Sequence, residues 1–276
     1  VQAFIAGHLF TPALRYKFMI ETVPGRFDIM DLFLDYRFHQ QARLRFGIAK
    51  VGFMRMRLNA WKNQQFVDFS DTLRYWGTER QLGFTLHNGL GRNPGHEYEV
   101  GVYAGQPTRP GISYGLARLS GEPRPHPMLV SGDVEPITEF HPEIVAHYAY
   151  NGNDIDVTVE TDWARTGFRY SLGVGFSYDF RPSAYRDFAM RIAAEMMFKA
   201  YGWNLIGVFW TGFYDKRDDL GDPNITTDFN LGILGMELQT GYHYADWGEV
   251  ALRYAFLRTS ENFRDDTRAR STQLID

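Results

Sequence analysis

The sequence lacks cysteine and lacks long apolar runs, and each absence excludes a class of protein. Without cysteine, the chain has no disulfides, no zinc–thiolate sites and no thiol catalysis. The longest run without a charged residue, about Tyr201 to Tyr214, is shorter than the roughly 18 apolar residues that a membrane-spanning helix needs. A bundle of transmembrane helices is therefore excluded. The chain also has no excess of basic residues, and its formal net charge of −4 argues against nucleic acid as a partner.

Aromatic residues, in contrast, are abundant: 22 Phe, 16 Tyr and 6 Trp make up 16% of the chain. The mean hydropathy of −0.34 resembles that of a soluble protein. It is equally compatible with a membrane β-barrel, because only every second residue of a barrel strand meets lipid. Such barrels carry aromatic girdles at both membrane interfaces. The composition is therefore typical of an outer-membrane barrel.

Period-2 alternation is the main structural signal, and it is clearest from Phe168 to Phe180. Alternate positions are apolar throughout, and the positions between them are polar or very small. The apolar set is Phe168, Tyr170, Leu172, Val174, Phe176, Tyr178 and Phe180. Thirteen residues at about 3.3 Å each span about 43 Å, and a tilt near 45° reduces this to about 30 Å, the thickness of a bilayer core. This length favours a transmembrane strand over the shorter strands of soluble proteins.

The same alternation recurs along the chain and predicts about twelve strands. Further examples are residues 14–21, 30–38, 43–48, 97–102, 154–160 and 249–256. Long connections are predicted at about 53–75, 105–140 and 215–227, with short turns elsewhere, as in barrels with short turns at one rim and long loops at the other. The order of short and long connections loses its parity after Trp163. We therefore expect a missed or split strand, most simply within 105–140.

The segment from Phe188 to Ala200 is ambiguous from its residues alone. It is rich in strong helix formers, which favours a helix. Its charged residues alternate with apolar ones, which also permits a strand.

Two stretches resemble the phosphate-selective porin family (the O and P type). The first runs Arg45-Phe-Gly-Ile-Ala-Lys-Val-Gly-Phe-Met-Arg-Met-Arg-Leu58, and Gln65-Phe-Val-Asp-Phe-Ser70 and Glu79-Arg-Gln-Leu-Gly83 follow it. The second runs Ala193-Ala-Glu-Met-Met-Phe-Lys-Ala-Tyr-Gly-Trp-Asn-Leu-Ile206 and is similar to a hairpin of that family. The resemblance implies a sixteen-stranded trimeric porin, and it implies a strand for residues 188–200.

The chain departs from the family pattern in three respects. Gly52 stands where the family has proline, the chain is not basic, and the sequence stops at Asp276 without a terminal aromatic strand. We therefore expect residues 1–276 to form a single transmembrane antiparallel β-barrel domain that lacks its C-terminal closing strands.

A pore needs lumen-facing charges and an inward-folded loop. By alternation and by position in the long connection, the predicted pore-lining residues are Arg43, Arg45, Lys50, Arg55, Arg57, Arg169, Arg191, Lys199, Arg253, Glu195 and Glu249. Arg55 and Arg57 are candidates for an anion-attracting constriction, because guanidinium binds oxyanions bidentately. The alternative is a structural network of ion pairs, since opposite charges are nearly balanced.

Other constellations are weaker. Residues 218–224 have the composition of a calcium loop but no EF-hand spacing, and His141, Glu143 and His147 would share one face of a strand. A solvated loop and a solvated lumen wall explain both sets, so no metal or cofactor is predicted. Ser171 with His147 lacks any G-x-S-x-G context, so the protein is predicted not to be an enzyme.

These observations predict a porin of the bacterial outer membrane, a water-filled channel for passive diffusion of small solutes that include anions such as phosphate. The expected partners are outer-membrane lipid, small-molecule or anionic solutes, and further copies in a homotrimer or a larger membrane complex. The alternative is a β-barrel scaffold or anchor subunit within a larger envelope complex.

Overall fold

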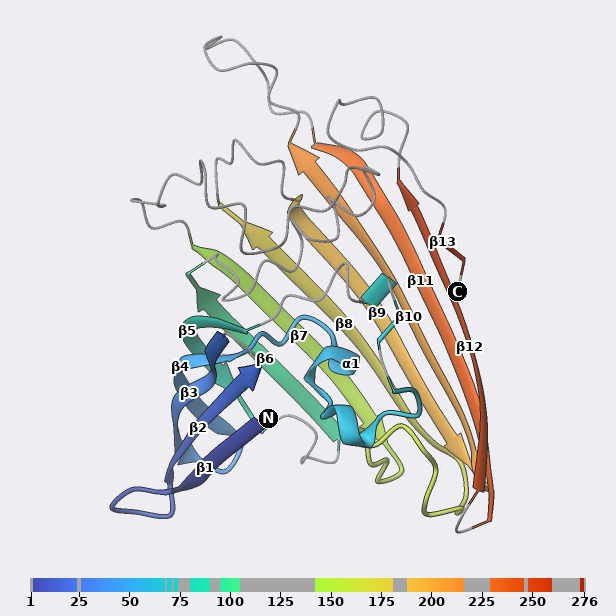
Figure 1. Ribbon diagram of the computed structural model, residues 1–276, viewed down its shortest axis with the longest axis horizontal. Coiled ribbons are helices and arrows are strands. Elements are labelled where there is room, and N and C mark those ends of the chain that lie inside the picture. The colour runs from blue at the N-terminus through green and yellow to red at the C-terminus, as the bar shows by residue number, and fades with distance from the viewer. Residues whose placement is uncertain are drawn as a thin grey trace, which may run out of the picture.

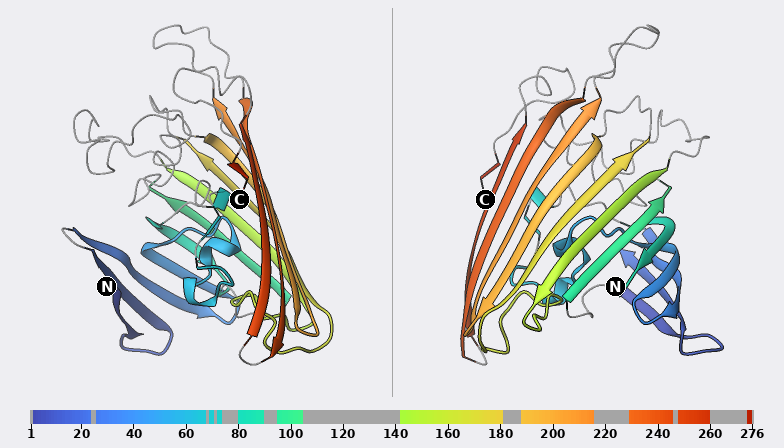
Figure 2. Two further views of the ribbon diagram at one scale, coloured as in Figure 1. Left: turned by 45° about the vertical axis from the view of Figure 1, so that its right-hand side comes forward. Right: turned by 180° about the vertical axis from the view of Figure 1, so that it is seen from behind.

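The chain forms one antiparallel sheet in which every strand pairs with its neighbours in sequence (Figure 1). The computed structural model describes residues 2–23, 26–67, 69–70, 72–73, 80–89, 95–104, 142–180, 188–215, 229–245, 248–259 and 274–275. The sheet curves, so it has a concave and a convex face (Figure 2). Over these residues it is open, with β1 at one edge and β13 at the other. The predicted all-β antiparallel fold with about twelve strands is confirmed.

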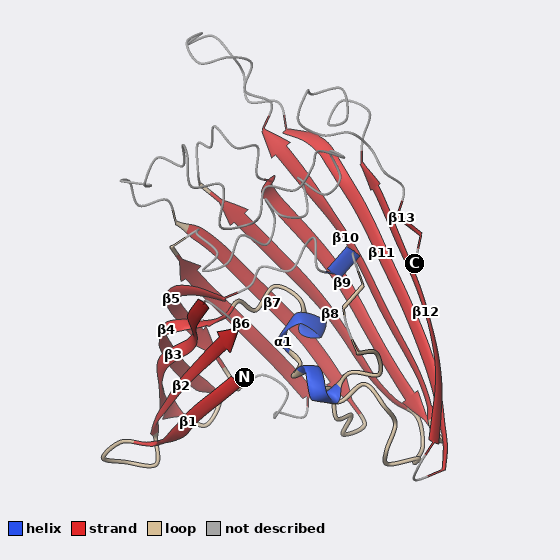
Figure 3. Ribbon diagram, in the orientation of Figure 1, coloured by secondary structure: helices blue, strands red, loops and turns tan. Residues whose placement is uncertain are grey.

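Within the described residues the sheet has thirteen strands, the last of which is very short. They are β1 (Gln2–His8), β2 (Leu14–Val23), β3 (Arg26–His39), β4 (Ala42–Lys50), β5 (Arg80–His87), β6 (Gly95–Tyr103), β7 (Glu143–Gly152), β8 (Arg169–Asp179), β9 (Phe188–Ala200), β10 (Trp203–Asp215), β11 (Phe229–Ala245), β12 (Gly248–Thr259) and β13 (Leu274–Ile275). Helical turns occur at α1 (Arg55–Leu58) and at the 3-10 turn η1 (Trp61–Asn63), both inside the β4–β5 connection (Figure 3). Among the described helices, none has the length and apolar character to cross a membrane.

Antiparallel pairing places successive connections at opposite rims of the sheet. One end, the short-turn rim, holds the last residues of β1, β3, β5, β7, β9 and β11 and the first residues of the strands that follow them. The other end, the long-loop rim, holds the last residues of β2, β4, β6, β8, β10 and β12 and the first residues of the strands that follow them. Apart from 153–168 and 24–25, connection length follows the predicted division between rims.

One predicted strand is wrong. The alternating residues 154–160 form no strand and lie in the irregular connection 153–168. Ile155 and Val157 are buried there against the apolar cluster inside the sheet. Their alternate spacing therefore reflects the packing of a loop and not a strand. This false strand caused the apparent loss of parity after Trp163. The strand expected within 105–140 lies outside the described residues.

Residues 188–200 form strand β9. The strand pairs with β8 and β10 along nearly its whole length, so tertiary pairing overrides the helix propensity of its residues. The resemblance-based prediction of a strand is confirmed.

Exposure on the two faces is the inverse of that in a soluble protein. On the convex face, apolar side chains are open, with Phe84, Val174 and Leu252 exposed by 56%, 55% and 71%. On the concave face, charged side chains such as Glu97 and Glu99 are fully buried. Contiguous exposed apolar surface is costly in water, so the convex face is built for a non-aqueous environment.

A charge placed at the middle of the convex face tests this interpretation. Val174→Lys is expected to reduce the free energy of unfolding from lipid vesicles by about 2–4 kcal/mol, the cost of a lysine near the bilayer midplane. The control is Tyr201→Lys, in the exposed turn between β9 and β10. Equal, small effects of both changes, within about 0.5 kcal/mol, would indicate that water covers this face.

Candidate functional site

The concave face is occupied by the first part of the β4–β5 connection. We call residues 51–67, 69–70 and 72–73 the inserted segment. Its one-turn helix α1 lies on the concave side of the sheet (Figure 1). Val51, Phe53, Met54 and Leu73 are almost completely buried. The segment is therefore packed against the concave face of the sheet, which we call the wall, and is buried like a protein core.

An apolar cluster anchors the segment. Its side chains pack with residues of β7 and β9–β12, among them Trp210, Ile233 and Leu257, all fully buried. Burying each such side chain stabilises the docked segment by about 1.5–3 kcal/mol. These positions are inward-facing yet apolar, which distinguishes them from the polar remainder of the concave face.

Carboxylates of the wall accept hydrogen bonds from polar groups of the segment. Glu99 accepts the backbone N–H of Gly52 at 2.9 Å, and Glu195 accepts that of Arg55 at 2.8 Å. Further along, Glu237 is hydrogen-bonded to the Ser70 hydroxyl. Backbone N–H groups buried without an acceptor would be costly, so these glutamates make the insertion possible.

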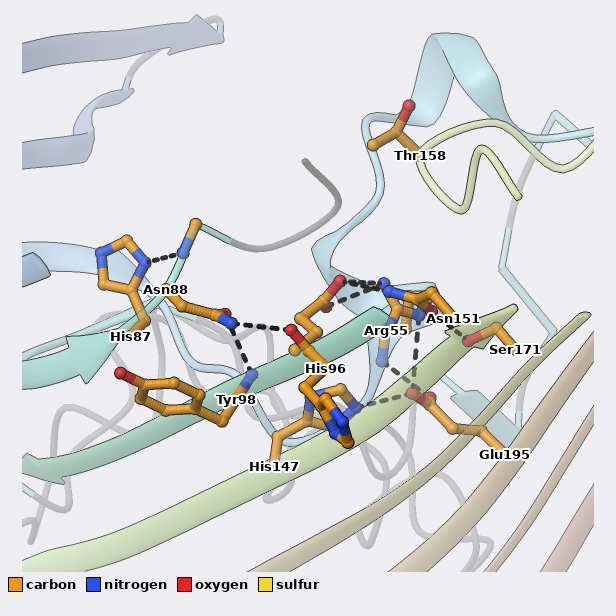
Figure 4. Close-up of polar contacts among 12 residues, drawn as sticks. Arg55, His87, Asn88, His96, Tyr98, His147, Asn151, Thr158, Ser171 and Glu195 are labelled. Carbon is orange, nitrogen blue, oxygen red and sulfur yellow. Dashed lines mark hydrogen bonds and ion pairs between the residues drawn. The ribbon is translucent and has the colours of Figure 1, made fainter. Parts of the chain in front are cut away.

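Arg55 forms the centre of this polar contact (Figure 4). Its guanidinium lies 2.8 Å from a Glu97 oxygen, and its Nε lies 3.8 Å from Glu195. Glu195 is also bonded to His147 Nε2 at 2.6 Å. Arg55 is buried, with 5% of its surface exposed. The prediction that Arg55 lines an anion-attracting constriction is therefore corrected: its charge is enclosed between two carboxylates.

Glycines on the inner face of the wall make room for the segment. A Cβ atom at Gly175 of β8 would lie 2.0 Å from the carbonyl oxygen of Phe53, and one at Gly241 of β11 would lie 2.2 Å from the Gln65 amide nitrogen. A larger residue at Gly175 would collide with the backbone of the docked chain, and one at Gly241 would displace the end of the Gln65 side chain. The wall is thus shaped for this segment by sterics as well as by charge.

Two lysines hold the loops through their carbonyl groups. Lys50 Nζ donates to the carbonyl oxygens of Arg57, Leu58 and Asn59, at 2.9, 3.3 and 2.9 Å, and so closes the end of α1. Lys199 Nζ donates to three carbonyl oxygens of the connection 153–168. Both residues were predicted to line the pore, and both instead bind backbone.

The inserted segment meets the connection 153–168, which enters from the opposite rim. The Glu160 N–H donates to the Asn63 carbonyl at 3.0 Å, and Asn63 Nδ2 donates to the Thr158 carbonyl at 3.0 Å. The Glu160 carboxylate accepts the N–H of Gln65 and the amide of Gln239, both at 2.8 Å. Burial raises the pKa of Glu160 above its usual value, although these hydrogen bonds oppose the shift.

Two predicted arginines are also paired within the wall. Arg169 is bonded to Asp162 of the connection 153–168. Arg191 is bonded to Glu143 and donates to Ser177 at 2.7 Å. Both side chains are buried, so they belong to a structural ion-pair network on the β7–β9 wall.

The remaining predicted residues lie in three places. Arg57 and Arg253 stack on Phe69 and Phe66, with guanidinium-to-ring distances of 4.4 and 4.6 Å. Glu249 accepts from Gln65 and from Thr161. A third group lies apart from the inserted segment, because Arg43 and Arg45 surround Asp35 on β3–β5. Sequence analysis thus finds the correct face of these residues but not their partners.

The metal and nucleophile candidates have other contacts. Glu143 binds Arg191 and His147 binds Glu195, while His141 lies outside the described residues, as do residues 218–224. Across the described part of the chain, no group of three or more His, Asp or Glu is arranged to hold a metal. The Ser171 hydroxyl donates to Asn151 at 2.7 Å (Figure 4).

No protein-family model matches the chain, and no curated protein matches it either. Among solved structures, the chain is similar to "OmpT (in-vitro folded), an outer membrane protein of Vibrio cholerae", with 9% identity and a TM-score of 0.42. The similarity covers 99% of this chain and 84% of that one. These comparisons give no support to the resemblance to phosphate-selective porins.

The prediction that the protein is not an enzyme is corrected at this point. The matched structure is the outer membrane protein OmpT, and this finding gives no ground for excluding an enzyme. The exclusion based on the missing G-x-S-x-G motif is therefore withdrawn.

Several residues that build the site were not singled out by their sequence context. The inward carboxylate Glu237 lies in a long apolar stretch, and Gly175 and Gly241 give no chemical signal of their own. One feature of the sequence did indicate them: very small residues stand on the polar face of a strand, as at Gly173 and Gly175. Small residues there leave space beside the wall, which another segment of the chain can fill.

Docking of the inserted segment should depend on the wall glycines. Gly175→Ala is expected to displace the backbone at Phe53 and to speed trypsin cleavage after Arg57 or Lys62 in the folded protein. Gly167→Ala is the matched control, because a Cβ there meets nothing within 4 Å. Unchanged cleavage of the Gly175 variant would mean that the wall does not shape the docking.

The buried carboxyl of Glu160 should make stability depend on pH. Its pKa is raised in the folded state, so the stability it contributes is present at low pH and is lost as pH rises through that folded pKa. Glu160→Gln keeps both acceptor contacts and is expected to flatten this part of the profile of denaturation midpoint against pH. Asp154→Asn, an exposed carboxyl in the same connection, is the control. A flat wild-type profile over this range would contradict the assignment.

Proposed function

We propose that the chain is a wall of an outer-membrane β-barrel that forms a water-filled passage for small solutes. The inverse exposure of the two faces carries this proposal. A convex face of open aromatic and aliphatic side chains needs hydrocarbon, and a concave face of charged side chains needs water or polar partners. Both requirements are met when the strands span a bilayer around an aqueous interior. Bacterial outer-membrane barrels keep their short turns on the periplasmic side, so the short-turn rim is proposed to face the periplasm.

The inserted segment would narrow this passage on one side. It covers the inner face of β6–β12 and binds the carboxylates there. Glu97, Glu99 and Glu237 are therefore all at most 1% exposed. The passage would therefore run along β1–β5.

The accessible charge along that remaining wall is cationic, although the whole chain is acidic. The basic side chains on the inner side of β2–β5 are Arg15, Lys17, Arg37, Arg43, Arg45 and Arg80. Asp31 and Asp35 are the buried acids between them. Arg43, Arg45 and Arg80 are only 14–15% exposed beside Asp35 and Asp31. A preference for small anions is expected from Arg15, Lys17 and Arg37, which are half-buried or exposed.

A scaffold or anchor subunit of a larger envelope complex is the second candidate. The apolar cluster between the segment and β7–β12 fills a large part of the concave face, which favours an occluded interior. Association into a homotrimer remains a proposal under either candidate.

Planar-bilayer recording tests the pore. Purified protein is expected to produce stepwise ohmic conductance, and a KCl gradient is expected to give a reversal potential with the sign of anion preference. Gly175→Ala should raise the conductance, because a loosened segment leaves a wider passage, whereas Gly167→Ala should leave it unchanged.

Two results would speak against the pore. A folded, membrane-inserted protein that does not conduct, and that is extracted with a stoichiometric partner, would favour the scaffold. Conductance with cation preference would retain the pore and reject the role assigned to the β2–β5 arginines.

A further inference from the structure

His147 of β7 lies between two of the carboxylates that hold the inserted segment. Its Nε2 is 2.6 Å from Glu195 of β9, which accepts the N–H of Arg55 (Figure 4). On the β6 side, the register places His147 directly opposite Glu99, which accepts the N–H of Gly52. Directly opposed residues share one face, with Cβ atoms about 4.5–5.5 Å apart. The imidazole therefore stands between two acceptors on which docking of the segment depends.

Two polar atoms of these neighbours have no hydrogen-bond partner among the described residues. They are Nδ1 of His147 and Oε2 of Glu99, and the two residues are only 2% and 0% exposed. Because Nε2 donates to the carboxylate of Glu195, Nδ1 of a neutral imidazole carries a lone pair. Two buried acceptors on adjacent strands thus lack a donor, and the cost of removing them from water is not offset.

The charge of Glu99 is also without a cation. Its carboxylate accepts the N–H of Gly52 and the hydroxyl of Tyr103, and within the described part of the chain it forms no ion pair. Arg55, the arginine of the segment beside it, is bonded to Glu97 and Glu195. A proton on Nδ1 of His147 would supply both the missing donor and a positive charge next to Glu99.

The other titratable and charged groups around this pair have partners of their own. They are His87 of β5, Glu97 and Tyr103 of β6, Glu143 of β7, Arg191 and Glu195 of β9, and Arg55 of the segment, while β8 faces the pair with Gly175. His87 is bonded to Asp35, and Glu143 is bonded to Arg191. A proton that enters this part of the interior is therefore expected to bind to Glu99 or His147, as one shared site.

Docking of the segment strengthens the binding of that proton. Attraction between two opposite charges is about four times stronger at an effective dielectric constant of about 20 than in water at about 80. The segment covers Glu99 through Gly52 and keeps the pair dry, whereas water would screen the pair if the segment moved away. The docked state thus binds more protons than the undocked state. Lower pH therefore favours docking, and this advantage is lost as the pH rises.

We propose that one proton shared by Glu99 and His147 controls how firmly the inserted segment is docked, so that the segment is held at low pH and loosens as the pH rises. We call this pair the proton switch. It rests on the proposed function, because a loosened segment has a consequence only if it narrows an aqueous passage. His147 acts as a positioning residue, through the carboxylates that bind Gly52 and Arg55.

Hydrogen–deuterium exchange of the detergent-solubilised full chain tests the proton switch without requiring conduction. Protection factors of the Gly52 and Arg55 amides, corrected for intrinsic exchange, are measured from about pH 5.5 to about pH 8, where imidazole changes its charge. The wild type is expected to lose protection with rising pH, by up to about tenfold per pH unit, the limit for linkage to one proton. His147→Gln keeps a donor for Glu195 but binds no proton, so its protection should be low and nearly independent of pH. His96→Gln, on the exposed face of β6, is the control and should keep the wild-type slope.

Glu99→Gln is an independent variant with the opposite expectation. It removes the uncompensated charge and brings an amide donor, so protection should be high at every pH. Glu160→Gln removes the other carboxyl whose protonation favours the folded state, and it should retain most of the wild-type slope.

Three results would overturn the proton switch. The first is wild-type protection that is independent of pH, which is expected if a water molecule donates to both acceptors in place of a proton. The second is an unchanged slope in His147→Gln, and the third is a slope that disappears in Glu160→Gln.

The failure of the proton switch and the failure of the pore would look different. Protection that falls with pH in the wild type but not in His147→Gln, with no conductance at any pH, would support the switch and reject the pore. Stable conductance with pH-independent protection would reject the switch and keep the pore. If both hold, the conductance of the wild type should rise with pH, and His147→Gln should already conduct at low pH as the wild type does at high pH.

Discussion

The hydrogen bonds between wall carboxylates and the N–H groups of the inserted segment hold the interior of this protein together. A loop that enters a barrel brings backbone donors with it, and each must find an acceptor once water is displaced. Glu99 and Glu195 supply such acceptors directly, and Glu160 supplies one from a separate connection. Because these acceptors come from three different parts of the chain, the segment has one position in which all are satisfied.

That position determines how charge is distributed inside the protein. The carboxylates that face the segment are enclosed by it, and Arg55 is enclosed with them. The arginines of β2–β4 lie outside this contact, and Arg37 is exposed. Under the proposed function, a chain with a formal net charge of −4 therefore presents positive groups to a solute in its interior. Net charge alone would predict the reverse, since it does not distinguish buried from accessible groups.

Strand periodicity made the fold predictable, and its failures have identifiable causes. The alternation in β8 specifies which side chains leave the interior, because a one-residue shift would move the whole apolar set to the wrong face. The same pattern misled at Ile155 and Val157, where two buried loop residues imitate a strand. Alternation also identified the inward face of Lys199, and position in the long connection identified Lys50. It could not identify the carbonyl groups they bind, because those belong to segments whose path depends on distant strands.

The sequential order of the sheet has a consequence for assembly. Each strand pairs with the one before it, so the wall can grow by contacts between neighbours in sequence, whose loops are shorter than the separations bridged by the inserted segment's more distant contacts. The inserted segment does not share this advantage, because its contacts join residues 47, 140 and 184 positions apart, at Glu99, Glu195 and Glu249. The residues that bind the segment are not all in place until β12 has joined the sheet. The interior of this protein is therefore completed last, after the surface that faces away from water.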